Sequence, residues 1–217
     1  MGYEEFEKIL LAGFPDVPEE RLEMFRKAEL LYRDWNSRIN VISRKDIDNL
    51  YPHHILHSLC IAEYLRRMEP SSLADFEKGT SVLDLGTGGG FPGIPLAILF
   101  PNSRFTLCDS VGKKIKVASA VAEGLGLDNV TTVNARAESL TGKCDYVVTR
   151  AVAALEDFYP WVKGKYRKEV LCLKGGDVVE EIYRMQTRFG FRGGFRTWQV
   201  SGWLDDEYFK GKFVISF

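Results

Sequence analysis

The sequence predicts an α/β protein with a Rossmann-like, doubly wound sheet, helices on both faces of the sheet and a helical extension at the N-terminus. Two observations carry this prediction. From residue 81 onward, short apolar runs alternate with helical patterns, as they do in βαβ units. Before that point, apolar residues recur with the period of amphipathic helices.

The first 70 residues predict three helices. Apolar side chains recur at helical spacing over residues 6–14 and 19–36, and again from Ile55 to Leu65, where the pattern ends before Pro70. We interpret residues 1–70 as a helical extension and residues 71–217 as a ligand-binding sheet domain. Residues 69–79 are expected to form the linker between the two.

The sheet domain predicts five strands joined by helices and closed by an antiparallel pair. The strands are expected at residues 80–85, 104–108, 129–133, 145–149 and 168–173. Helices are expected at residues 93–100, 112–126, 154–162 and 176–188. The last two apolar runs, residues 195–201 and 213–217, are typical of the closing strands.

Composition is that of an ordinary globular protein, with 217 residues of which 45% are hydrophobic. No apolar run approaches the ~18 residues of a membrane span, and the start lacks a signal-peptide pattern. The four cysteines are scattered, without a C-x-x-C pair. We therefore expect no membrane contact, and reduced, buried thiols in a cytoplasmic protein.

A glycine-rich turn follows the first predicted strand and precedes a helix. It contains Gly86, Thr87, Gly88 and Gly90, a spacing that differs from the dinucleotide pattern G-x-G-x-x-G. Such a turn lets a ligand approach the backbone closely. Asp84, two residues before it, would repel a diphosphate but hold an amine. This combination indicates S-adenosylmethionine and a class I methyltransferase.

Two later turns extend the predicted cofactor site. Asp109 ends the second strand 23 residues after Gly86, near the spacing at which an acid binds a ribose, and Ser110 follows it. A carboxylate can accept from both ribose hydroxyls, although Asp109 could instead cap the next helix. After the third strand come Ala137 and Glu138, where class I methyltransferases place the adenine.

Two basic side chains, Arg150 and Lys174, follow the fourth and fifth predicted strands. The carboxyl ends of parallel strands form the ligand crevice of open α/β sheets. We therefore expect both residues to contact an anionic or acceptor-rich substrate, such as a phosphate-bearing nucleotide. The alternative for each is an ordinary surface salt bridge.

Basic residues gather in the second half of the chain, although a net charge of −1 argues against a general nucleic-acid binder. Residues 104–196 carry sixteen basic and eleven acidic side chains. They form either ordinary solvated surface or a one-sided phosphate-binding face. The residues of interest are Lys113, Lys114, Lys116, Arg136, Arg184, Arg188, Arg192, Arg196 and the basic run 163–168.

All three histidines lie in one segment, as His53, His54 and His57. His53 and His57 are one helical turn apart and could share a metal, but no acid or cysteine nearby in sequence completes a tetrahedral site. We interpret the segment as a pH-sensitive lid over the cofactor mouth, since an unperturbed imidazole titrates near pH ~6.5.

Seven short motifs follow one another along the chain. They are W-N-x-x-I-N-x-I-S from Trp35, H-I-L-x-S from His54, L-D-x-G-T-G-x-G-F-P-G-I-P-L from Leu83, D-S-x-x-K-K from Asp109, R-x-E from Arg136, R-A from Arg150 and L-K-G from Leu173. In this order they resemble the motifs of the small-subunit ribosomal RNA guanine-N7 methyltransferases, the RsmG or GidB family, from about residue 30 to the C-terminus. The stretch from Gly86 to Leu96 is the most specific part.

The resemblance implies S-adenosylmethionine as donor and N7 of one guanine of 16S rRNA, at position 527, as acceptor. The partner would be 16S rRNA or the small ribosomal subunit, met by a monomer in a bacterial cytoplasm. Because N7 carries a lone pair, positioning matters more than a general base. Arg150, beside the donor, or Lys174 would hold O6 or a phosphate, while Phe91 and His54 would exclude water. Contacts to the RNA backbone would come from Lys113, Lys114, Arg136 and Arg188.

The chain departs from the family pattern at three positions, of which one is His53, where the family usually has Arg or Lys. His57 stands where the family usually has Asp, and Lys114 stands where Arg is common. Two other functions share the same cofactor motifs: a small-molecule methyltransferase, which does not need the basic clusters, and a non-catalytic nucleotide-binding regulatory module. Incubation with labelled cofactor and undermethylated ribosomal subunits separates the three. Labelled RNA indicates the first function, labelled small metabolites the second, and cofactor binding without turnover the third.

Overall fold

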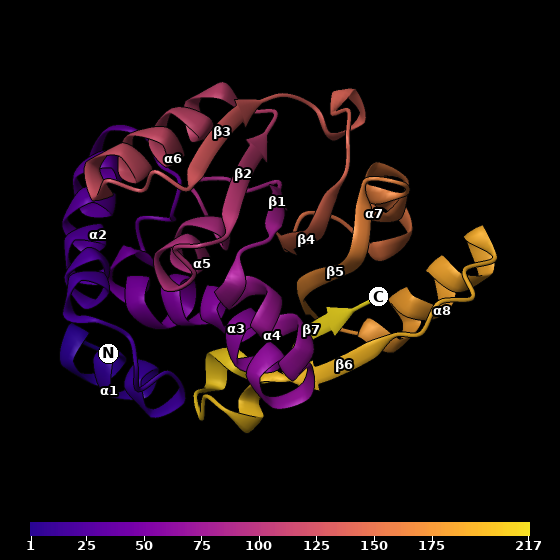
Figure 1. Ribbon diagram of the computed structural model, residues 1–217, viewed down its shortest axis with the longest axis horizontal. Helices are drawn as coiled ribbons and strands as arrows, with labels where there is room; N and C mark the ends of the chain where they lie inside the picture. The colour runs from indigo at the N-terminus through magenta and orange to yellow at the C-terminus, as the bar shows by residue number, and fades with distance from the viewer.

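The computed structural model describes all 217 residues and contains one seven-stranded sheet with the order β3-β2-β1-β4-β5-β7-β6 (Figure 1). The first five strands are parallel, and β7 runs antiparallel to both β5 and β6. The predicted parallel sheet and closing pair are therefore confirmed. The strands are β1 (Ser81–Leu85), β2 (Arg104–Asp109), β3 (Val130–Asn134), β4 (Cys144–Arg150), β5 (Tyr166–Gly175), β6 (Arg196–Gln199) and β7 (Lys212–Ser216).

Helices cover both faces of this sheet, as predicted (Figure 1). The helices that follow β1 and β2 share one face with the N-terminal helices, and the helices that follow β4 and β5 lie on the other. None of them is long and apolar enough to cross a membrane. The helices are α1 (Tyr3–Gly13), α2 (Glu19–Arg38), α3 (His57–Met68), α4 (Pro70–Lys78), α5 (Gly93–Leu99), α6 (Gly112–Leu125), α7 (Leu155–Val162) and α8 (Val178–Phe189).

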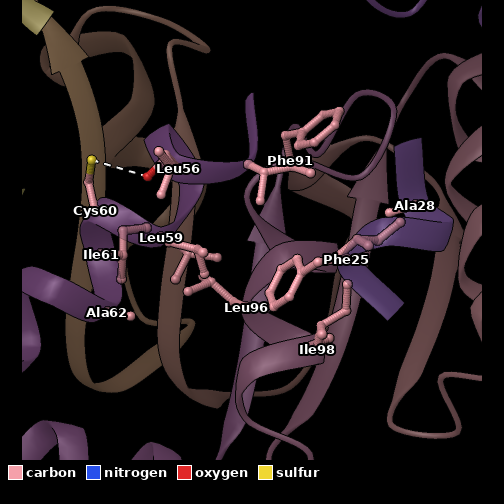
Figure 2. Close-up of a cluster of buried hydrophobic side chains, with 14 of the residues drawn as sticks. Phe25, Ala28, Leu56, Leu59, Cys60, Ile61, Ala62, Phe91, Leu96 and Ile98 are labelled. Carbon is pink, nitrogen blue, oxygen red and sulfur yellow. Dashed lines mark hydrogen bonds between the residues drawn. The ribbon is translucent and has the colours of Figure 1, made fainter. Parts of the chain in front are cut away.

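The N-terminal helices are part of the main core of the protein. Figure 2 shows Phe25 of α2, Leu59 of α3 and Leu96 of α5 meeting in one buried layer. This cluster contains 41 buried residues and reaches from Phe6 to Val214, so the extension and one sheet face bury each other's apolar surface. A second cluster of 14 residues lies beneath α7 and α8. The division near residue 70 remains a prediction about domains.

The linker predicted at residues 69–79 is wrong, because α4 (Pro70–Lys78) occupies most of it. The helical pattern of residues 55–65 ends before Pro70, but proline is well accommodated in the first turn of a helix, and Pro70 begins α4. Phe76 of α4 is fully buried and contacts Phe100 and Tyr146. The segment is therefore part of the packed structure.

A short helical segment places two histidines beside Arg150 at the end of β4. A π-helical segment, η2 (Leu50–Leu56), precedes α3 and carries His53 and His54. Single π turns occur frequently at functional sites. The 3₁₀ turns are η1 (Ile47–Asn49), η3 (Ala137–Ser139), η4 (Val200–Gly202) and η5 (Glu207–Phe209).

Candidate active site

The glycine-rich turn after β1 is built around a buried carboxylate. Asp84 is fully buried, and its Oδ2 accepts hydrogen bonds from Thr87 Oγ1 at 2.6 Å and from the Gly93 amide at 2.7 Å. Burial raises the pKa of Asp84 to about 7, against the opposing effect of these hydrogen bonds. Its Oδ1 is buried without a partner. Asp84 therefore holds the turn in place through Oδ2, while Oδ1 has no hydrogen-bond partner within the protein.

Three glycines of the turn have backbone conformations that side chains rarely adopt. The φ angles are 75° at Gly86, 58° at Gly88 and 110° at Gly90. A Cβ at Gly86 would lie 2.5 Å from Val152 Cγ2. The turn and the 151–154 loop can therefore lie this close to each other only because residue 86 has no side chain. A Cβ at Gly88 would meet no protein atom within 4 Å, so its exposed side is left to a ligand.

Asp109 connects this turn to the next one. Its Oδ2 accepts from the Gly88 amide at 2.9 Å, and its Oδ1 accepts from the Val111 amide at 2.8 Å, just before α6. This contact closes a turn before the helix, and no side chain caps α6 at its N-cap residue Val111, so the helix-capping alternative is not realised. Because a carboxylate oxygen can accept more than one hydrogen bond, both oxygens retain capacity for a ligand.

Two cavities adjoin at the carboxyl ends of the strands, and they share Gly86, Asp109 and Val152. The first, of about 200 Å³, runs over β2 and β3 toward η3. It is also lined by Leu85, Cys108, Ser110, Ala135, Arg136, Ala137, Glu138 and Trp161. The second, of about 360 Å³, lies between the glycine turn and the end of β4. It is also lined by Val41, Thr87, Gly88, Gly89, Phe91, Lys114, Arg150 and Ala151.

Arg150 ends β4 and borders the second cavity. Its guanidinium donates to the His53 carbonyl at 3.2 Å, lies 3.2 Å from His54 Nδ1 and stacks 5.0 Å from the centre of the Phe91 ring. Burial lowers the pKa of Arg150, but an arginine remains charged at neutral pH. The next residue, Ala151, has φ of 48°, which is rare for a residue with a side chain.

A carboxylate that the sequence analysis missed joins two of the histidines. Asp46, in the loop before η1, lies 2.6 Å from His53 Nδ1 and 2.8 Å from His54 Nε2. It is seven and eight residues away from them along the chain, outside any motif. The bend of the chain between α2 and η2 brings Asp46 close to the two histidines, so no spacing in the sequence predicts the contact.

The pH-sensitive lid stays a prediction for the histidine segment, and the surroundings of His54 and His57 oppose protonation of these two rings. Burial, followed by the charge of Arg150, lowers the pKa of His54 to about 4 and that of His57 well below its ordinary value. His57 packs against Tyr208 and Phe209, and its Nε2 has no partner. No group of three or more His, Cys, Asp or Glu side chains is arranged to hold a metal ion.

Lys174 does not line either cavity. Its Nζ donates to the Ala153 carbonyl at 2.6 Å and pairs with Glu181 at 2.8 Å. The same glutamate accepts from the Leu155 amide at 3.0 Å. In this structure Lys174 braces the loop that follows Arg150, and substrate contact by Lys174 remains a prediction.

Six of the predicted basic residues fall into two groups. Lys114 and Arg136 line the cavities, and the exposed Lys113 lies beside Lys114 at the start of α6. Three arginines further along the chain face acidic partners instead: Arg184 pairs with Glu180, Arg188 with Asp157, and Arg196 with Glu69 and Glu169. Ion pairing neutralises much of the charge that the sequence places there.

Solved structures share this fold. The magnesium protoporphyrin IX methyltransferase of Synechocystis PCC 6803 with bound SAM matches 87% of this chain and 95% of its own, with a TM-score of 0.60 at 16% identity. A SAM-dependent O-methyltransferase of Thermotoga maritima matches 72% of this chain and 69% of its own, with a TM-score of 0.53 at 14% identity. The fold and the glycine-turn site together define a class I methyltransferase.

The family follows from the sequence comparisons. The GidB family model, rRNA small subunit methyltransferase G, matches residues 21–202. The ribosomal RNA small subunit methyltransferase G of Porphyromonas gingivalis is 50% identical over 96% of this chain and 91% of its own length. That of Christiangramia forsetii is 45% identical over 96% and 95%. The chain belongs to this family, and S-adenosylmethionine is its methyl donor.

Proposed function

We propose that this protein transfers the methyl group of S-adenosylmethionine to N7 of a single guanine of 16S rRNA. The observation that carries the proposal is the pair of adjoining cavities, of which one suits a nucleoside and the other has Arg150 and Lys114 on its wall. The family to which the chain belongs supports the same conclusion.

The residues of the first cavity fit the nucleoside part of the donor. The Asp109 carboxylate borders both cavities and has acceptor capacity left for ribose hydroxyls. Ala137 and Glu138 line the far end, where the adenine would lie, together with Ser110. The glycine turn, with the unused Oδ1 of Asp84 below it, would hold the amino-acid part. When bound there, the donor supplies an activated methyl group.

The second cavity fits a guanine that needs no general base. N7 of neutral guanine is a lone-pair acceptor, so the protein has to orient the base and exclude water. Methyl transfer leaves a positive charge on the base, so a cation is best placed on O6 or a phosphate and away from N7. Arg150 is the side chain suited to that contact, because its fork can bind two acceptors. Phe91 and Val41 would keep water out.

The RNA backbone would meet the rim of the second cavity. Lys113 and Lys114 begin α6, and the exposed Arg44 and Lys45 lie in the loop that carries Val41. We propose that these cations contact phosphates without reading sequence. The partner is then 16S rRNA or the small ribosomal subunit, and we propose that the protein meets it as a monomer in the bacterial cytoplasm.

The test is incubation of the protein with methyl-labelled donor and small subunits that lack the modification. With the wild type we expect label in 16S rRNA. The Arg150→Ala variant should transfer the methyl group at least 10-fold more slowly, while its affinity for the donor stays within about threefold of the wild-type value. The Arg188→Ala variant serves as the matched control and should act like the wild type. Label in small metabolites, or donor binding without any transfer, would contradict the proposal.

A further inference from the structure

Asp46 is the carboxylate of a hydrogen-bond network that ends at Arg150. One carboxylate oxygen lies 2.6 Å from His53 Nδ1, and the other lies 2.8 Å from His54 Nε2. On its opposite side, His54 Nδ1 lies 3.2 Å from Arg150 Nη2. The imidazole of His54 therefore sits between an anion and a cation, with one ring nitrogen facing each.

These neighbours determine which nitrogen of His54 carries the proton. A guanidinium can only donate, so Nδ1 must offer a lone pair to Arg150. A carboxylate can only accept, so Nε2 must carry the hydrogen. The lowered pKa of His54, about 4, means that the ring is neutral at physiological pH and has just one N–H. The ring is thus fixed in the Nε2–H tautomer by its two partners.

The loop that carries Asp46 is itself well held. The Asn36 side chain accepts from the Val41 and Ile42 amides, both at 2.9 Å, and donates to the Ile42 carbonyl. The Asp46 amide donates to the Ser43 carbonyl at 2.9 Å. Val41 of this loop lines the second cavity with Arg150. Asp46 therefore has a defined position relative to the cavity.

His53 is fixed from two directions. Its ring stacks on Tyr208, with 3.6 Å between ring centres and 10° between planes, while Asp46 accepts from its Nδ1. Its carbonyl accepts from Arg150 Nη1 at 3.2 Å. The guanidinium is thus held through both histidines, by a backbone carbonyl and by a ring nitrogen.

We propose that Asp46 is a positioning residue: it fixes His54 as the Nε2–H tautomer and, through His54, orients the Arg150 guanidinium toward the second cavity. The part of this proposal that concerns methyl transfer rests on the proposed function. Asp46 does not line either cavity, so it acts through the histidines that it contacts.

Replacing Asp46 by Asn changes the chemistry with almost no change in size. If the amide oxygen continues to accept from His53, its NH₂ faces His54 Nε2 and donates to it. The single proton of His54 then moves to Nδ1, where it opposes the N–H groups of Arg150. The guanidinium loses its partner and its fixed orientation.

The first readout is the tautomer, which does not depend on activity. Nitrogen–proton correlation spectra of the full-length protein are expected to show His54, assigned by the loss of its signal in His54→Ala, protonated at Nε2 in the wild type. In Asp46→Asn we expect a shift to Nδ1–H and broadened Arg150 guanidinium signals. An Nδ1–H tautomer in the wild type would overturn the proposal, even if Asp46→Asn failed to fold.

The second readout is methyl transfer to unmodified small subunits. Asp46→Asn should lower kcat by about 10- to 100-fold, with donor affinity changed less than about threefold. Asp48→Asn is the matched control, because Asp48 lies two residues further on, in η1, where it is exposed and pairs with Arg33. In a His54→Ala background, Asp46→Asn should have less than about a twofold effect.

Independent effects of the two substitutions, or an Asp46→Asn variant as active as Asp48→Asn, would refute the positioning role. Failure of the proposed function is distinguishable. In that case the wild type itself would leave 16S rRNA unlabelled, and the tautomer and guanidinium spectra would still decide whether Asp46 orients Arg150.

Discussion

At the scale of single residues, the site is a set of carboxylates that each organise a turn. Asp84 fixes the glycine turn, Asp109 joins that turn to the start of α6, and Asp46 joins the histidines. Each accepts at least two hydrogen bonds, so each holds backbone or side chains at the ends of parallel strands. The ligand then meets a surface that is already ordered.

Asp109→Ala should weaken S-adenosylmethionine binding by about 1–3 kcal/mol, because charged hydrogen bonds to the donor are lost and the Gly88 amide loses its acceptor. Titration calorimetry measures this change directly. Asp128→Ala, an exposed acid in the turn before β3, is the control and should bind as the wild type does. Equal affinity in all three proteins would remove Asp109 from the cofactor site.

The raised pKa of Asp84 predicts that the free energy of unfolding depends on pH. Burial raises its pKa from the ordinary 3.8 to about 7, so the folded protein binds this proton more tightly than the unfolded chain does. The resulting stabilisation is complete below about pH 4 and is lost as the pH rises through about 7. Without donor, the free energy of unfolding should fall by a few kcal/mol from this group, on the order of 1.4 kcal/mol per unit of pKa shift.

Asp84→Asn removes the titration and should flatten this part of the profile. Urea unfolding of both proteins between about pH 5 and pH 8 makes the comparison. Parallel profiles in the wild type and Asp84→Asn would show that the carboxyl titrates in its ordinary range.

At the scale of elements, the strands of the parallel sheet were the part of the fold that the sequence predicted best. The buried centres of parallel strands are apolar runs, so β1, β4 and β5 were predicted close to their observed bounds. Helix α4 was missed because Pro70 can begin a helix as well as end one.

The contacts of side chains were harder to predict than the elements. Lys174 stands at the predicted strand end, but its ion pair with Glu181 depends on how α8 packs against the loop after β4. Asp46 depends on the bend between α2 and η2 in the same way. Sequence spacing fixes where a residue lies on an element, whereas packing decides what the side chain reaches.

Helix α2 should contribute strongly to stability although it lies outside the sheet. Phe25 is fully buried against Phe6 and the α5 layer (Figure 2), so Phe25→Ala should cost about 3–5 kcal/mol of unfolding free energy. Leu30→Ala in the same helix is the control, since Leu30 is 69% exposed, and should cost less than about 0.5 kcal/mol. Similar losses in both variants would contradict the shared core.

At the scale of the whole molecule, the distribution of charge matters more than its net value. The chain carries a net charge of −1, yet Lys114 lines the second cavity with the exposed Lys113 next to it in sequence, while acids pair with the arginines of α8. An RNA-binding surface at the cavity rim places the phosphates beside the methyl donor. The same number of cations at α8 would hold the RNA without directing it.

Salt dependence separates the two surfaces. Replacing Lys113 and Lys114 by Ala should reduce the slope of log affinity against log salt by about one unit per lost phosphate contact. Replacing Arg184 and Arg188 by Ala should leave the slope unchanged, because both are ion-paired. Filter binding to unmodified small subunits gives the slopes, and a change confined to the arginine variant would move the RNA surface to α8.

The central claim is that one guanine of 16S rRNA acquires its methyl group at N7. The most direct measurement treats 16S rRNA from the reaction with borohydride and aniline, which cleave the chain at N7-methylguanine. With the wild type we expect a single new cleavage position, and with Arg150→Ala a large loss of that product. Methylated 16S rRNA that resists cleavage, or cleavage at many guanines, would contradict the account.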